Sequence, residues 1–299
     1  MRPTYYGALS VIHVLRAHGY EALLAGGCVR DRLRGVEPLD YDIATSAKPN
    51  QVQAAFPATE AVGAAFGVVL VLQGGAAYQV ASFRGDGPYL DGRRPSEIRF
   101  TGREEDALRR DFTVNGLFYD PERDEVLDFV GGRADLEAGL LRAIGNPVER
   151  FEEDRLRVLR CVRFACQLNL RVDPATWMAV LAFAGRLDGL ASERIAAELT
   201  KILRSPRPRR GLELLDESGL LAKLLPELLP LKGCPQPPEF HPEGDVWEHT
   251  LRVIQVVAGQ GRPSPALAWA ALLHDVGKPG TVTLTDRLRF HGHETLGAE

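Results

Sequence analysis

The stretch that decides the fold of the first half of the chain runs from Leu23 to Asp31 and reads Leu-Leu-Ala-Gly-Gly-Cys-Val-Arg-Asp. The apolar start is typical of a buried strand, and Gly26 and Gly27 predict a turn that leads directly into a helix. Glycines here let backbone N–H groups approach an anion, and the helix start adds about half a positive charge. Arg30 could complete a phosphate grip. A purely structural turn is the alternative, because the spacing matches neither the P-loop nor the dinucleotide-binding fingerprint.

Two acids, Asp40 and Asp42, follow in the next predicted strand, over 39–44. The period of two in a strand places both carboxylates on one face and Tyr41 on the other. Converging carboxylates, together with substrate phosphates, are the oxygen ligands that Mg²⁺ takes. Asp40 and Asp42 are therefore candidate ligands of Mg²⁺. The alternative is a strand edge with solvated acids.

Around these segments, the pattern predicts an α+β fold with a small mixed β-sheet. Helices are predicted over 4–18 and 29–33, and strands over 21–25, 39–44, 68–72, 78–83, 98–101 and 125–129. Residues 84–96 are rich in Gly, Pro and Asp and predict a mobile loop. After about residue 145 the strand signals vanish, and helical periodicity over 191–203 and 211–225 predicts an all-helical second half. Proline clusters suggest boundaries near 205 and 235.

The composition is that of an ordinary soluble globular protein, with 299 residues, 45% of them hydrophobic and 25% charged. No apolar stretch approaches the roughly 20 residues that cross a bilayer, and the first residues open no signal peptide, so we expect a cytoplasmic protein. The four cysteines lack C-x-x-C spacing, which argues against a zinc finger or a disulfide framework. The net charge of −4 hides arginine-rich segments at 150–171 and 204–210, and such local basic stripes can bind phosphates.

Residues 153–164 read Glu-Asp-Arg-Leu-Arg-Val-Leu-Arg-Cys-Val-Arg-Phe and predict a helix with two different faces. The apolar face carries Val158, Val162, Ala165 and Cys166. The opposite face carries Asp154, Arg157, Arg160 and Phe164, with Arg163 at its edge. A surface helix with i,i+3 salt bridges is one interpretation. However, a row of arginines with only two acids beside it has excess positive charge, and a triphosphate would complement it.

Four segments in this order resemble the signature of the class II nucleotidyltransferases, the family of bacterial CCA-adding tRNA nucleotidyltransferases and poly(A) polymerases. They are the Gly-Gly turn with its Asp-x-Asp, the string Arg-Arg-Asp-Phe-Thr-Val-Asn at 109–115, the short segment 128–132, and the segment 153–164. The resemblance implies Mg²⁺-dependent phosphoryl transfer to an RNA 3′ end, with Asp40 and Asp42 as the catalytic residues that hold the metal and with no protein nucleophile. The implied partners are the 3′ end of tRNA, ATP and CTP, and neither a membrane nor a protein partner is implied.

The resemblance also implies roles for the charged residues. Asp154 and Arg157 would hydrogen-bond the base edge of the incoming nucleotide and so select CTP or ATP. The triphosphate would be contacted by Arg110, Arg160 and Arg163, and the ribose hydroxyls by Asp111. The segment 84–95 resembles the flexible loop of members that add the terminal A, which argues against an enzyme that adds only C. For the basic run at 204–210, a solvated linker is the default interpretation and RNA contact the alternative.

The last part of the chain, with His249, His274, Asp275, His291 and His293, resembles the opening of an HD domain. In such domains His and Asp ligands bind a divalent metal for phosphohydrolysis, so His249, His274 and Asp275 are possible metal ligands. Since the chain ends before the final Asp of the pattern, we expect a partial HD domain. The predicted domains are a catalytic head (1–143), a helical neck (144–204), a helical body (205–238) and this partial domain (239–299).

Two other functions stay open at this point. The first is a poly(A) polymerase of the same fold, although members of that group tend to place Pro after the Asp of the fourth segment, where this chain has Arg155. The second is an HD-type metal-dependent phosphohydrolase whose head only binds a nucleotide. Either full CCA addition or A addition alone fits the main interpretation.

Overall fold

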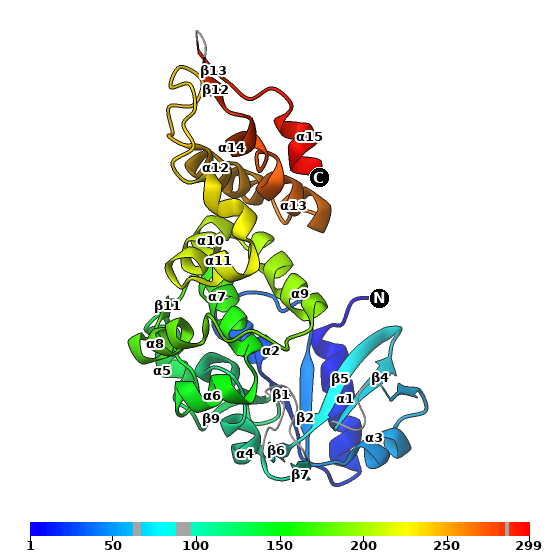
Figure 1. The fold of residues 1–299 in the computed structure, drawn as a ribbon. Helices are drawn as coiled ribbons and strands as arrows, with labels where there is room; N and C mark the ends of the chain where they lie inside the picture. Colours follow the sequence, from blue (N-terminus) through cyan, green and yellow to red (C-terminus); the bar gives the residue numbers. More distant parts are fainter. Residues whose placement is uncertain (62–66, 88–96, 285–286) are drawn as a thin grey trace. The chain divides into compact units, whose positions relative to one another are not determined.

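The computed structural model describes residues 1–61, 67–87, 97–284 and 287–299. The chain divides into two units, Met1–Asp154 and Arg155–Glu299 (Figure 1). None of the helices in the described part of the chain is long and apolar enough to cross a membrane.

Within the described part of the first unit, seven strands form one mixed sheet in the order β3-β4-β5-β2-β1-β8-β9 (Figure 1). The strands are β1 (Ala22–Ala25), β2 (Asp42–Thr45), β3 (Thr59–Glu60), β4 (Val68–Gln73), β5 (Ala76–Ser82), β8 (Leu117–Asp120) and β9 (Glu125–Asp128). Only β2 and β5 of these seven pair in parallel. A separate hairpin joins β6 (Arg84–Asp86) to β7 (Ile98–Phe100).

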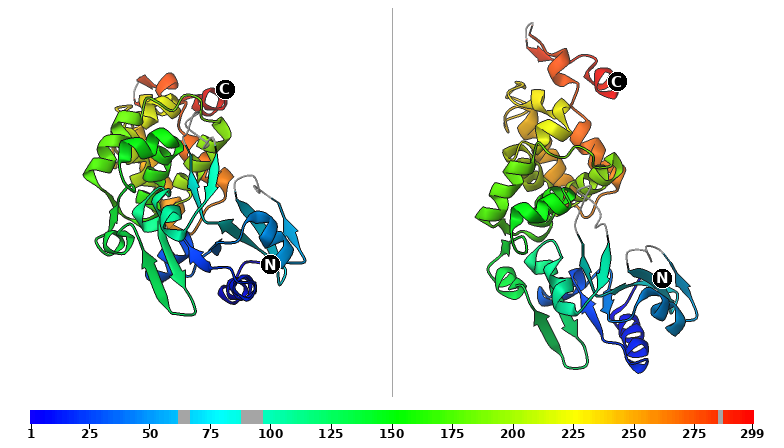
Figure 2. Two further views of the ribbon diagram at one scale, coloured as in Figure 1. Left: turned by 90° about the horizontal axis from the view of Figure 1, so that it is seen from below. Right: turned by 60° about the horizontal axis from the view of Figure 1, so that its bottom comes forward.

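Alternation along the strands divides the core of this unit into two layers. Leu24 and Ile43 point into the first layer, which α1 (Tyr5–Ala17), α2 (Gly27–Leu33) and α3 (Pro49–Ala55) cover. Figure 2 shows α1, in dark blue, against this side of the sheet. The opposite side carries the second layer, made of Leu23, Ala25, Ala44, Phe83, Phe118 and, from α4 (Arg103–Leu108), Ala107.

The remaining elements are short or helical. In the first unit they are the 3₁₀ turn η2 (Thr113–Asn115), α5 (Gly132–Glu137), β10 (Leu140–Leu141) and α6 (Pro147–Glu153). In the second unit they are α7 (Leu156–Leu168), β11 (Arg171–Val172), α8 (Pro174–Phe183), α9 (Ser192–Leu203), α10 (Pro208–Glu217), α11 (Leu220–Leu224), η3 (Pro226–Leu231), α12 (Val246–Gly259), α13 (Pro265–Leu273), α14 (Lys278–Thr281), β12 (Thr283–Leu284), β13 (Leu288–Arg289) and α15 (His293–Ala298).

The α+β class is confirmed, and the differences from the predicted elements have local causes. The strand predicted over 39–44 begins only at Asp42, so Asp40 precedes it. The strand β8 was not predicted, because its four residues are all buried and show no alternation. The helix predicted over 211–225 ends at Glu217, because Gly219 adopts φ +80°.

Two further predictions about the second half and the loop need correction. The second half is not wholly helical, since β11, β12 and β13 are strands of two residues each. The first residues of the predicted loop, Arg84–Asp86, form β6, whereas 88–96 lie outside the described residues.

Candidate active site

The Gly26-Gly27 turn connects β1 to α2, as the sequence predicts. Gly26 has φ +71° and ψ −123°, a conformation that favours glycine. Its N–H donates a hydrogen bond of 2.9 Å to the carbonyl oxygen of Leu117 in β8. A Cβ atom at Gly26 would lie 2.9 Å from Nη1 of Arg110. The absence of a side chain therefore lets the guanidinium of Arg110 lie against the backbone of the turn.

Asp42 lies on the face of the sheet that carries the second core layer. Ile43 is buried in the first layer, so the alternation within β2 points Asp42 to the opposite side, whereas Asp40 precedes the strand and is exposed. Ala44, which follows the same alternation, is part of the second layer. Tyr41 packs in the first layer, as an alternation with Asp42 predicts, but Asp40 is not part of the strand on which the prediction placed it.

The electrostatics of this pair suit a divalent cation. Burial and the negative charge of Asp40 raise the pKa of Asp42 to about 6, while the guanidinium of Arg110 acts in the opposite direction. Two carboxylate groups that repel each other, with hard oxygen donors, match the ligands that Mg²⁺ prefers in proteins. The residues present therefore fit the predicted metal.

Arg110 is fixed in place beside these acids. Its Nε and Nη2 donate to Oδ2 of Asp106 at 3.2 and 2.9 Å, and its Nη1 donates to the carbonyl oxygen of Asn115 at 3.2 Å. The guanidinium carbon lies 4.8 Å from the ring centroid of Phe118, a residue of the second core layer. Gly26, Asp42 and Arg110 are thereby brought together from three separate segments.

Arg30 is a buried residue that supports this site through hydrogen bonds. It is 5% exposed, and its Nη1 donates to Oδ1 of Asn115 at 2.6 Å, while its Nη2 pairs with Asp31 at 2.8 Å. The amide nitrogen of Asn115 donates in turn to Oδ1 of Asp111 at 3.0 Å. The structure thus places Arg30 and Asp111 in one network. Asn115 had no predicted role, although a polar side chain in this segment was a signal for a hydrogen-bonded position.

The third motif, 128–132, builds the support of the η2 segment. Oδ1 of Asp128 accepts hydrogen bonds from the N–H groups of Val130 and Gly132 at the start of α5. A Cβ atom at Gly132 would lie 2.2 Å from the carbonyl oxygen of Thr113. The hydroxyl of Thr113 also donates to Oδ2 of Asp135 at 2.7 Å. This motif therefore holds the 3₁₀ turn that contains Asn115.

In the second unit, α7 is buried on more sides than its sequence predicts. Val158, Val162, Ala165 and Cys166 are buried as expected. Arg157, Arg163 and Phe164, predicted on the open charged face or its edge, are buried as well, so the prediction of one packed and one open face is wrong. Asp154 ends α6 in the first unit, and Arg157 and Arg160 lie in the first half of α7. The guanidinium carbon of Arg160 lies 5.3 Å from the ring centroid of Phe164.

Arg163 has a different environment from the one expected of a triphosphate contact. Its Nε lies 2.5 Å from Oε2 of Glu198 in α9, and its Nη1 donates to Gln167 at 3.1 Å. Burial acts to raise the pKa of Glu198, but Arg163 and Lys201 together hold it below its ordinary value. Arg163 therefore ties α7 to α9 within this unit. The basic run at 204–210 is likewise engaged internally, because Arg209 pairs with Glu213 and Glu248.

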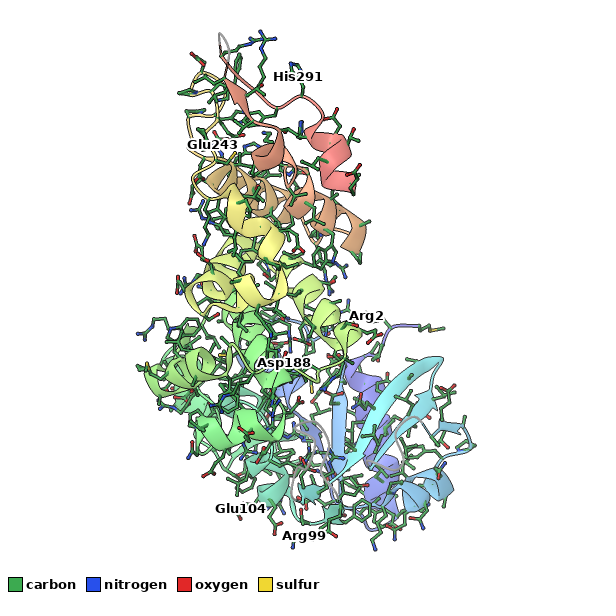
Figure 3. All side chains as sticks on the ribbon, viewed as in Figure 1. Arg2, Arg99, Glu104, Asp188, Glu243 and His291 are labelled. Carbon is green, nitrogen blue, oxygen red and sulfur yellow. The ribbon has the colours of Figure 1, made fainter. Side chains whose placement is uncertain are left out.

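The possible HD ligands also converge. His249 in α12, His274 and Asp275 offer ligand atoms that all lie within 4.8 Å of one another. Nε2 of His274 lies 3.1 Å, and Nε2 of His249 3.8 Å, from Oδ2 of Asp275. Nε2 of His293 lies 3.7 Å from the other oxygen, whereas His291 is exposed (Figure 3). Two imidazoles and a carboxylate are a donor set that fits a divalent metal.

Two residues that the sequence did not single out complete this cluster. Glu243, labelled in Figure 3, accepts a hydrogen bond of 2.6 Å from Nδ1 of His249, and this bond holds the pKa of the carboxyl below its ordinary value. Lys278 places its ammonium 2.8 Å from Oδ2 of Asp275. Burial would raise the pKa of Asp275, but His274 and Lys278 lower it.

Comparison with known proteins gives the chain three family matches. The family models are "Poly A polymerase head domain" over residues 22–142, "Probable RNA and SrmB- binding site of polymerase A" over 169–231, and "HD domain" over 246–299. The CCA-adding enzyme of Geobacillus thermodenitrificans is 44% identical over 221 residues, which cover 74% of this chain and 54% of that protein. The CCA-adding enzyme of Streptococcus mutans is 43% identical over 212 residues, which cover 71% and 53%.

Solved structures of CCA-adding enzymes are also similar to this chain. The CCA-adding enzyme of Bacillus stearothermophilus, solved in complex with CTP, matches with a TM-score of 0.75 and 35% identity, over 93% of this chain and 65% of that one. The Thermotoga maritima CCA-adding enzyme, solved with tRNA, shares the fold with a TM-score of 0.64 at 20% identity. The chain spans about half the length of the curated relatives it matches. On these matches and the four motifs, the chain belongs to the nucleotidyltransferase family of the CCA-adding enzymes and poly(A) polymerases.

Proposed function

We propose that this chain is a template-independent RNA nucleotidyltransferase that adds CMP, AMP or both to the 3′ end of tRNA and releases pyrophosphate. The observation that carries the proposal is that Arg110 lies against the Gly26 turn and interacts electrostatically with Asp42, which in turn interacts with Asp40. The relatives named CCA-adding enzymes support it, as does the similar structure solved with CTP.

In the head, Asp40 and Asp42 would hold Mg²⁺. When bound, this metal supplies Lewis-acid activation of the RNA 3′-hydroxyl and neutralises charge on the phosphates. The backbone of the glycine turn and the guanidinium of Arg110 orient the triphosphate, and Asp111 receives the ribose hydroxyls. Because no protein nucleophile is needed, catalysis rests on positioning and on electrostatic stabilisation.

For base selection we propose Asp154 and Arg157, whose donors and acceptors would pair with the edge of cytosine or adenine. A wrong base would leave buried polar groups without partners, which gives strong discrimination. Arg160 would contact the triphosphate. For Arg30 and Arg163 we propose a supporting role in nucleotide binding, since their guanidinium groups bond to Asn115 and Glu198.

With this function we propose a division into a head (1–143), a neck (144–204), a body (205–238) and a partial HD domain (239–299). We also propose a cytoplasmic location, where the tRNA substrate is found.

The test is to incubate the protein with tRNAs that lack one, two or all three nucleotides of the CCA end, together with labelled CTP or ATP. Three added nucleotides on the shortest tRNA identify CCA addition, and a single A on the CC end identifies A addition. A long ladder of A on any RNA would identify a poly(A) polymerase instead. If no tRNA is extended, the proposal is wrong.

The His249, His274 and Asp275 cluster supports a second candidate activity, metal-dependent phosphohydrolysis. Asp40→Asn combined with Asp42→Asn separates the two activities. Loss of nucleotide addition with phosphatase activity intact assigns each reaction to its own site. A wild-type protein that hydrolyses phosphoesters but incorporates no nucleotide would favour the phosphohydrolase function.

A further inference from the structure

Asp106 in α4 is a buried carboxylate that two consecutive arginines share. It is 1% exposed. Its Oδ2 accepts hydrogen bonds from Nε and Nη2 of Arg110 at 3.2 and 2.9 Å. Its Oδ1 accepts from Nε and Nη2 of Arg109 at 2.9 and 2.6 Å, and from the backbone N–H of Arg84 at 3.3 Å. Both oxygens are thus occupied, by groups from β6 and from the second motif.

The two arginines reach different parts of the head. Arg110 extends to the Gly26 turn and the Asn115 carbonyl oxygen, beside Asp42. Arg109 donates to the carbonyl oxygen of Arg84 at 3.0 Å, so the first residue of β6 is bonded through both its N–H and its C=O.

Arg109 also lines a cavity of about 250 Å³ in this unit, together with Asp86 and Arg99. Figure 3 labels Arg99, on β7, at the end of the unit where α4 begins. The carboxylate of Asp106 therefore connects the β6–β7 hairpin to the nucleotide turn.

In this arrangement one carboxylate holds two guanidinium groups in place. An arginine side chain has about 2 kcal/mol of rotamer entropy, so an unanchored guanidinium would sample many positions at the turn. Burial acts to raise the pKa of Asp106, but Arg110 and Arg109 hold it below its ordinary value, so the carboxylate is charged at neutral pH. Two N–H groups of each guanidinium donate to one oxygen of the charged, buried carboxylate, and this pair of charge-assisted bonds restricts the direction of the guanidinium.

We propose that Asp106 is a positioning residue for nucleotide addition: it aims Arg110 at the incoming triphosphate and, through Arg109, fixes the base of the β6–β7 hairpin. The inference rests on the proposed function, since it needs Arg110 to contact the nucleotide. Asp106 itself touches neither substrate nor metal in this scheme. Its effect passes entirely through the two guanidinium groups.

The experiment measures KM and kcat for CTP and ATP with a tRNA primer, using the full chain with Asp106→Asn. We expect the nucleotide KM to rise about tenfold with a smaller change in kcat, since the amide leaves one guanidinium without its acceptor. The matched control is Asp120→Asn, which breaks another buried carboxylate–arginine pair of this unit, Asp120 with Arg16 at 2.8 Å. The control should lower the thermal midpoint and leave the nucleotide KM unchanged.

A double-mutant cycle separates positioning from general destabilisation. If Asp106 acts through Arg110, Asp106→Asn should raise KM less than twofold further in an Arg110→Ala background. An additive effect, or an unchanged KM in the single variant, overturns the inference. Should Asp106→Asn show no cooperative thermal unfolding, Asp106→Glu takes its place with the same readouts. A wild-type chain that extends no tRNA would instead reject the proposed function.

Discussion

At Asp42 the requirements of stability and of activity conflict. The carboxyl is held among buried groups with a second acid nearby, and these surroundings raise its pKa to about 6. A folded-state pKa above the ordinary value means that the folded protein binds this proton more tightly than the unfolded chain does. The ionised carboxylate therefore destabilises the fold above about pH 6, and this effect is absent below about pH 4, where both states are protonated.

Asp42→Asn should accordingly stabilise the metal-free protein while it abolishes nucleotide addition. At pH 7.5 in EDTA we expect a higher thermal midpoint, equivalent to about 2 kcal/mol, with the gain shrinking as the pH falls from 6 to 4. Nucleotide addition should drop by roughly a thousandfold or more. Asp120→Asn is the opposite control, because the pKa of Asp120 is lowered although burial acts to raise it. An Asp42→Asn protein that is less stable, or that retains activity, would contradict the assignment.

A second prediction at this scale concerns Glu243, whose bond to Nδ1 of His249 leaves Nε2 to face Asp275. A carboxylate behind a histidine ligand fixes its tautomer and raises its basicity. Glu243→Gln should therefore weaken Co²⁺ binding about 10- to 100-fold, followed by the visible absorption of the ion. The control is Glu248→Gln. Glu248 directly precedes His249, and its substitution breaks an ion pair with Arg209. Equal Co²⁺ affinity in the Glu243 variant and the wild type would argue against this role.

At the scale of elements, the head is organised by close contacts between backbone segments. The β1–α2 turn, the η2 turn and the start of α5 approach one another at glycines, where a side chain has no room. The third motif is therefore a structural part of the active site: it holds the segment that carries Asp111 and Asn115.

Gly132→Ala tests this role of α5. The new methyl group would overlap the Thr113 carbonyl oxygen, so the η2 turn must shift, at a cost of about 3 kcal/mol in unfolding free energy. Nucleotide KM should rise because Asp111 and Asn115 move with the turn. Gly102→Ala is the matched control, since a Cβ there meets nothing within 4 Å and its φ is −91°. If both variants behave alike in thermal melts and in nucleotide KM, the motif has no such role.

At the scale of the whole molecule, the proposed chemistry and the proposed base selection fall mainly on different units. Asp40, Asp42 and Arg110 belong to the first unit, whereas Arg157 lies in the first turn of α7 in the second. Such a division predicts that selectivity can be changed without abolishing transfer.

Asp154→Ala and Arg157→Ala should each lower the preference for CTP and ATP over UTP and GTP at least tenfold, with some transfer retained. The measurement is kcat/KM for all four nucleotides on a tRNA that lacks its CCA end. Asp42→Asn, by comparison, should abolish transfer of every nucleotide. An Arg157→Ala enzyme with unchanged selectivity would remove the idea of a protein template.

Several local elements followed from the sequence alone, because they depend on neighbouring residues, whereas β8 and the helix end before Gly219 did not. The glycine turn, the alternation that separates Tyr41 from Asp42, and the burial of Val158 and Val162 in α7 follow from short local patterns. The partners of the charged groups did not follow. Arg163 reaches Glu198, 35 residues away, and Arg30 reaches Asn115, 85 residues away.

Only the tertiary structure decided which arginines are anchored and which carboxylate anchors them. In the sequence, nothing distinguishes Asp106 from the other acids of a short helix. Its spacing does not show that it is buried between Arg109 and Arg110. A charge pattern along the chain fixes how many ions of each sign are present. Which ions pair depends on the desolvation and distance that arise when strands and helices pack, and these quantities exist only in the folded molecule.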